Sequence, residues 1–89
     1  MPYIEQEERN RFDIGPDLPM GMSPGELNYF LTTRVDDFLS VNGLDYGNIN
    51  TVIGVLECVK LELYRRIAAP YEDTKLDENG EVYLCNVEE

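Results

Sequence analysis

The residues able to bind a ligand are few, and most are basic or aromatic. The 89-residue chain has 18 acidic residues, 7 basic residues and no histidine, a formal net charge of −11 at pH 7. Positive charge is most concentrated in the run Tyr64-Arg65-Arg66, close to Tyr71. Guanidinium groups bind phosphates and carboxylates, and tyrosine rings stack on flat ligands. This pattern indicates binding of a small anion, and the candidate ligand-binding residues are Arg34, Lys60, Tyr64, Arg65, Arg66 and Tyr71.

The absence of histidine excludes the commonest catalytic sites. Ser-His-Asp and Cys-His arrangements and histidine zinc sites all require it. Cys58 and Cys85 cannot complete a thiolate zinc site by themselves. A calcium-loop template can be started at Asp77, but Val82 stands where such a loop requires glycine. We therefore expect no metal, no cofactor and no enzymatic activity.

The acidic balance limits the partners. A chain with a net charge of −11 is repelled by duplex nucleic acid and by anionic membranes, so we expect it to bind neither. No apolar run is long enough to span a bilayer. Two cysteines without a signal peptide are typical of free thiols in a reducing cytosol.

The first helix expected to position these residues covers about residues 24–41. Ser23-Pro24-Gly25-Glu26 has the pattern of a capping box with proline at the first helical position, and Asn42-Gly43 is a typical helix end. Arg34 projects from the apolar stripe. It either extends to solvent, pairs with a glutamate of the next helix, or is held for a ligand. The stripe consists of Leu27, Phe30, Leu31, Val35, Phe38 and Val41.

The second helix is expected over about residues 48–69, with Asp45 or Asn48 as its cap and Pro70 as its end. It is apolar around most of its circumference, so one neighbouring helix cannot cover it. Three of its residues lie outside the central stripe and require the N-terminal loop or a second copy of the chain: Cys58, Leu61 and Tyr64. Gly54 costs about 1 kcal/mol relative to alanine, which a closely approaching backbone would justify.

These elements predict one small, mainly α domain. A short turn joins the two helices, so we expect an antiparallel helical hairpin over residues 23–69. Residues 1–22 form an N-terminal arm, with an extended piece at Pro2–Ile4, helical turns over Glu5–Phe12 and an apolar loop over 14–22. Residues 70–89 form a β-hairpin and tail. Its strands are expected over about 75–84, turning at Asn79-Gly80 and docked on the helices, with Tyr3-Ile4 as a candidate third strand.

Four segments carry a resemblance to a known group of proteins: MPYI at the N-terminus, the central GVLECVKLELYRR, then APYED and ENGEVY. With these, the chain resembles a family of short proteins encoded by tailed bacteriophages. The resemblance spans the start of the chain and residues 44–83, and it brings no defined active residues. It implies an accessory protein in the host cytoplasm that acts on host machinery, including host defence.

Together these features favour a non-enzymatic phage accessory protein, active as a homo-oligomer that sequesters a small anionic signal such as a cyclic nucleotide. Two alternatives stay open. One is an acidic inhibitor or adaptor that binds a host protein through its charged surface or the loop 14–22. The other is a component of the virion or of its assembly.

Overall fold

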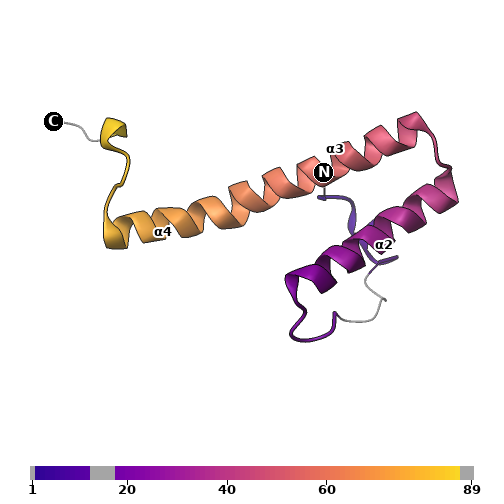
Figure 1. Ribbon diagram of the computed structural model, residues 1–89, viewed down its shortest axis with the longest axis horizontal. Coiled ribbons are helices and arrows are strands. Elements are labelled where there is room, and N and C mark those ends of the chain that lie inside the picture. The colour runs from indigo at the N-terminus through magenta and orange to yellow at the C-terminus, as the bar shows by residue number, and fades with distance from the viewer. Residues whose placement is uncertain (1, 13–17, 87–89) are drawn as a thin grey trace. The chain divides into compact units, whose positions relative to one another are not determined.

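The protein is mainly α-helical in the computed structural model, which describes residues 2–12 and 18–86 (Figure 1). No strand occurs among these residues, so the predicted mainly α class is confirmed and the predicted C-terminal β-hairpin over 75–84 is wrong. The elements are α1 (Gln6–Arg9), α2 (Pro24–Asn42), α3 (Tyr46–Leu63), the π-helical turn η1 (Tyr64–Ala68), α4 (Ala69–Asn79) and the 3₁₀ turn η2 (Leu84–Asn86).

Helix α2 begins and ends where its local sequence predicts. The Ser23 side-chain oxygen accepts a hydrogen bond from the Glu26 N–H at 3.1 Å, and the Glu26 carboxylate accepts one from the Ser23 N–H at 3.0 Å. These two bonds form the expected capping box. The hydrogen bond from the Ser23 backbone N–H and, second in size, one with the Ser23 side chain lower the pKa of the Glu26 carboxyl below its ordinary value of 4.5. At the other end Gly43 has φ +111°, and its N–H donates to the Leu39 carbonyl at 2.8 Å.

The turn between α2 and α3 is held by two polar side chains. Asp45 Oδ1 accepts a hydrogen bond from the Asn48 N–H at 2.8 Å, so Asp45 is the cap of α3. The Asn48 side chain donates to the carbonyls of Asn42 at 3.1 Å and Gly43 at 2.9 Å. The end of α2 is thereby tied to the first turn of α3.

The second helix does not end at Pro70, which corrects the predicted bound at residue 69. The backbone stays helical through η1 and α4 to Asn79. Proline lacks an N–H and clashes with the carbonyl four residues earlier, which normally breaks a helix. The chain instead widens by one turn of π-helix just before Pro70, where the Ala69 N–H donates to the carbonyl of Tyr64, five residues back. The wider turn accommodates the proline ring.

Asn79-Gly80 ends a helix here and does not turn a hairpin. Gly80 has φ +91°, and its N–H donates to the Leu76 carbonyl at 2.8 Å. A glycine with positive φ suits a helix end as well as a hairpin turn, so the dipeptide alone does not choose between them. The preceding residues include the helix formers Glu72, Lys75, Leu76 and Glu78, and Lys75 pairs with Glu78 one turn on, at 3.2 Å. A hairpin would also have placed Glu78 opposite Glu81, a like-charge pair.

The N-terminal arm is only partly regular. Residues 2–5 have no regular structure, so Tyr3 and Ile4 do not form the suggested third strand. The helical turns expected over Glu5–Phe12 are present as α1 and a following turn. Of the predicted apolar loop 14–22, residues 14–17 lie outside the described residues, whereas Leu18 is 53% exposed and Met20 fully exposed.

The chain divides into two compact units, Met1–Leu56 and Glu57–Glu89. The first contains α1, α2 and the first turns of α3, and the second contains the rest of α3, η1 and α4. No described side chain in either unit is fully buried, so the described residues contain no hydrophobic core. The apolar residues most protected from solvent in the first unit are only half-buried, and they include Val35, Leu39 and Val52.

Candidate functional site

Arg34, the first predicted ligand-binding residue, lies on α2 and is paired within its own helix. Its guanidinium is 3.0 Å from the Asp37 carboxylate and lies over the Phe30 ring, 5.5 Å from the ring centre. The side chain is 62% exposed. Of the alternatives the sequence left open, a solvent-exposed guanidinium is therefore observed.

Lys60 and Arg65 each face a carboxylate one turn earlier in the sequence. Lys60 Nζ is 3.1 Å from Glu57, and Arg65 is 3.0 Å from Glu62. These acid-first pairs are the ones expected from the spacing. The Glu62 carboxylate is only 18% exposed, whereas the Arg65 side chain is 66% exposed. Two of the predicted ligand-binding cations are thus already neutralised locally.

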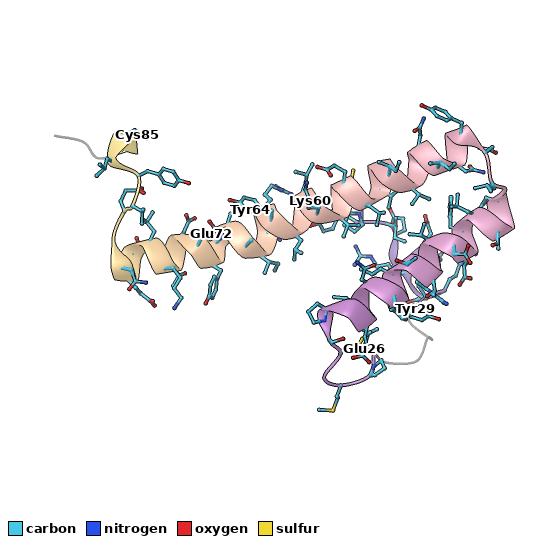
Figure 2. The ribbon with its side chains drawn as sticks, in the orientation of Figure 1. Glu26, Tyr29, Lys60, Tyr64, Glu72 and Cys85 are labelled. Carbon is cyan, nitrogen blue, oxygen red and sulfur yellow. The ribbon has the colours of Figure 1, made fainter. Side chains whose placement is uncertain are left out.

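The π-helical turn changes which aromatic residues share a face. In a regular helix, residues seven apart lie on nearly the same side, so Tyr71 would lie along the side of Tyr64. A π turn acts like one inserted residue and rotates the later part of the helix by roughly 100°. We therefore place Glu72, not Tyr71, nearest to the side of Tyr64 (labelled in Figure 2). Tyr71 lies beneath Lys75 instead, with the ammonium 5.6 Å from its ring centre.

The predicted site residues are divided between the two units of the chain. Arg34 belongs to the first unit and the other five to the second. Within the part of the chain that the structure describes, Arg66 makes no ion pair or hydrogen bond. Tyr64 and Tyr71 are 56% and 63% exposed. Among its described residues, the second unit thus offers one guanidinium without a partner, that of Arg66, and two exposed tyrosines, Tyr64 and Tyr71.

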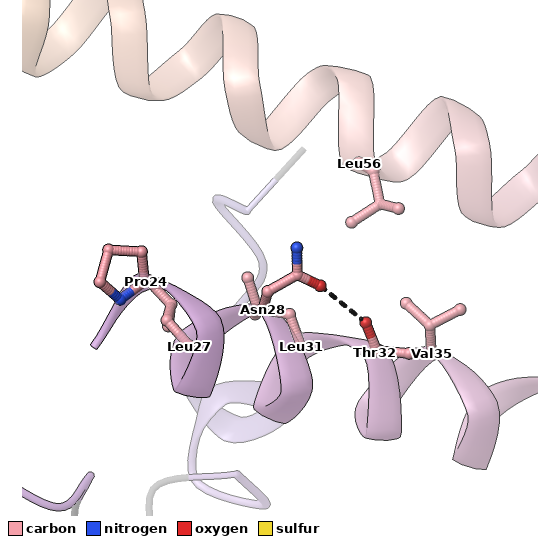
Figure 3. Close-up of a pocket in the computed structure, with 7 residues that line it drawn as sticks. All are labelled: Pro24, Leu27, Asn28, Leu31, Thr32, Val35 and Leu56. Carbon is pink, nitrogen blue, oxygen red and sulfur yellow. Dashed lines mark hydrogen bonds between the residues drawn. The ribbon is translucent and has the colours of Figure 1, made fainter. Parts of the chain in front are cut away.

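A different surface stands out in the first unit: an apolar groove between α2 and α3, here called the α2–α3 groove. It consists of two adjoining cavities of about 470 and 240 Å³ that share Leu31, Val35 and Leu56. Figure 3 shows the larger one, with Leu56 reaching from α3 toward α2. The lining residues are Pro24, Leu27, Asn28, Leu31, Thr32, Arg34, Val35, Phe38, Thr51, Val52, Val55 and Leu56.

The groove is apolar, and none of the described residues that line it carries a carboxylate. Two uncharged polar residues on the α2 side are paired with each other, because the Thr32 hydroxyl donates to Asn28 Oδ1 at 3.1 Å (Figure 3). Its one charged lining residue, Arg34, is paired with Asp37. On a chain with 18 acidic residues, a carboxylate-free groove is a surface suited to apolar side chains of a partner.

Sequence reasoning predicted that α2 and α3 pack against each other and missed the groove that remains between them. The sequence contained one signal for this groove. Residues 46–56, about three turns of α3, contain no charged side chain on any face. Such a helix needs cover on more sides than α2 provides.

Other kinds of site are not found among the described residues. No group of three or more His, Cys, Asp or Glu side chains in residues 2–12 and 18–86 could hold a metal ion. Cys58 and Cys85 are exposed free thiols. No helix in the described ranges has the length and apolarity needed to cross a bilayer.

The described residues form a small, mainly α-helical structure with an exposed apolar groove between α2 and α3. The chain belongs to the DUF6899 family, described as a domain of unknown function, which matches residues 1–82. No curated protein and no solved structure matches it.

Proposed function

We propose that this protein is a non-enzymatic interaction protein and that the α2–α3 groove is its binding surface. The observation that carries the proposal is the absence of carboxylates from an apolar groove on a chain of net charge −11. Acidic residues elsewhere keep the chain soluble and repel chance neighbours, while the groove offers apolar area to a matching helix. Capping and short-range ion pairs hold α2 and α3 ready for such packing.

Photo-crosslinking from inside the groove tests this proposal. A photoreactive amino acid replaces Leu31, which lines both cavities and is 49% exposed. The matched control carries it at Leu44, a residue of the turn that is 78% exposed. We expect a discrete crosslinked polypeptide from position 31 and none from position 44. Equal labelling from both positions, or none from either, would refute an interaction surface in the groove.

The resemblance to short proteins of tailed bacteriophages supports the biological setting that we propose: an accessory factor in the host cytoplasm, including action against host defence. Deletion of the gene from a phage that carries it is expected to lower plating efficiency on a defended host and to leave particle composition unchanged. Loss of a band from purified particles would instead indicate a virion or assembly component.

Sequestration of a small anion is the second candidate function, and the observation that favours it is Arg66. This guanidinium has no partner among the described residues and is next to the exposed Arg65 side chain. Calorimetry with a panel of cyclic mono- and dinucleotides tests it. Binding that is abolished by R66A and kept in R34A is the expected result. Absence of heat with every member of the panel would eliminate this candidate.

A further inference from the structure

We infer that the occupant of the α2–α3 groove is a second copy of this chain. The first units of two chains then pack against each other in a symmetric dimer. The inference rests on the proposed function, because it names the partner of the same surface.

The first argument is the apolar area that the first unit leaves exposed along the groove. Five of the lining side chains illustrate it: Leu27 is 44% exposed, Leu31 49%, Phe38 39%, Val55 55% and Leu56 45%. The interfaces of obligate homodimers are rich in apolar area of this kind. The same face of a second copy would cover these side chains in both chains at once.

The second argument is that folding itself needs the partner. No described side chain is fully buried in the single chain, whereas ordering the backbone costs about 1–2 kcal/mol per residue. That cost must be offset by burial of apolar area, which the described side chains of the first unit do not provide by themselves. A partner needed for folding must be present in equal amount wherever the chain is made. A second copy of the same chain meets that condition by itself.

The third argument is charge. Two chains of net charge −11 repel each other, so they can associate only through a surface that places no carboxylates opposite one another. A two-fold axis brings the same patch of each copy together. The groove has no carboxylate in its lining, and the exposed Arg34 can keep its charge in water at the edge. Helix α2 and the first turns of α3 from both copies would then form a four-helix core.

Light scattering and filtered NMR test the proposal on the unmodified chain. We expect the mass of two chains at micromolar concentration. In a mixture of labelled and unlabelled protein, we expect nuclear Overhauser effects between copies at Leu31, Val35 and Leu56. The second measurement does not depend on whether any variant folds.

Substitutions then separate the groove from the rest of the surface. Leu31→Glu places a carboxylate in the groove of both copies, and we expect the dimer dissociation constant to rise at least about a hundredfold. Leu44→Glu is the matched control, since it introduces the same charge at a residue of the turn, and we expect it to leave the constant within about threefold of the original.

The outcomes distinguish this inference from the proposed function. A folded monomer, or a dimer without contacts between copies at the groove, overturns the second copy as occupant. The groove stays an interaction surface if position 31 still crosslinks to another polypeptide. A monomer in which the chain's own residues fill the groove overturns both proposals.

Discussion

Replacing Gly54 with alanine tests the arrangement of α3 most directly, because it should raise Tm if the space beside Gly54 is open and lower Tm if another chain lies there. Gly54 lies in the interior of α3 and does not line the groove. A Cβ added there meets no atom within 4 Å. The close approach of another backbone, which the sequence suggested as a reason for this glycine, is therefore not made by the described residues.

The expected gain in stability comes from helix propensity alone, since no steric clash opposes it. Glycine in a helix interior costs about 1 kcal/mol relative to alanine, partly through the greater freedom of the unfolded chain. G54A should therefore stabilise each chain by about 1 kcal/mol, and a dimer by about 2 kcal/mol. For a chain of this size, the gain per chain raises Tm by about 4–8 °C.

The assay is thermal unfolding followed by circular dichroism at one fixed protein concentration, because the Tm of an oligomer depends on concentration. Gly43→Ala is the contrasting control. Gly43 has φ +111°, so alanine there is strained and should destabilise the chain by about 1–3 kcal/mol. If G54A lowers Tm or dissociates the oligomer, another chain lies against Gly54, and the groove is not the main interface.

Three further changes give independent checks. Because the pKa of Glu26 is lowered on folding, the stabilising effect of its carboxylate is complete above pH 4.5 and is lost as the pH falls through the lowered pKa of Glu26. E26Q keeps the cap without the charge, so its helicity should fall less than that of the original chain between pH 6 and pH 3. Identical profiles for the two proteins would contradict the capping role. Pro70→Ala removes the need for the π turn and should raise helix content, with a gain in stability of about 1–3 kcal/mol in urea titration. Pro24→Ala, at a helix start where proline fits, should change stability by less than about 0.5 kcal/mol, and equal effects would show that the π turn costs the helix nothing. Lys60→Ala should cost less than about 0.5 kcal/mol in the same titration, because its pair with Glu57 is exposed, and a larger loss would indicate a buried role.

Helix α2 was predictable because its two ends are determined by local chemistry. A capping box at Ser23–Glu26 and a positive-φ glycine at Gly43 need no tertiary contact to form. Asp45 could be named as one of two candidate caps for the same reason.

The C-terminal third was mispredicted because two local rules were applied without their context. Pro70 was expected to end a helix, but a single π turn accommodates it. Asn79-Gly80 was expected to turn a hairpin, although Asn42-Gly43 in the same chain was correctly expected to end a helix. The difference lies in the residues before the glycine, and those before Gly80 favour a helix with an internal Lys75–Glu78 pair.

The candidate site, too, was predictable where local spacing determines a contact and unpredictable elsewhere. The pairs Glu57–Lys60 and Glu62–Arg65 follow from spacing along one helix and were predicted. Arg34 was considered for a buried pair with the next helix, but it is exposed and pairs with Asp37. The α2–α3 groove depends on how far apart two apolar helices lie, which no local pattern specifies.

The two Asn-Gly sequences also have a consequence for chemical ageing. Asparagine before glycine is prone to deamidation, in which the glycine nitrogen attacks the asparagine side chain and isoaspartate is formed. In this protein both glycine N–H groups are engaged, Gly43 with Leu39 and Gly80 with Leu76, so each helix end protects its own asparagine. Asn42 has a second safeguard, because its side chain donates to the Phe38 carbonyl at 2.9 Å, and in the described part of the chain Asn79 has no such bond. Isoaspartate should therefore accumulate first at residue 79, at a rate that reports how often the end of α4 opens.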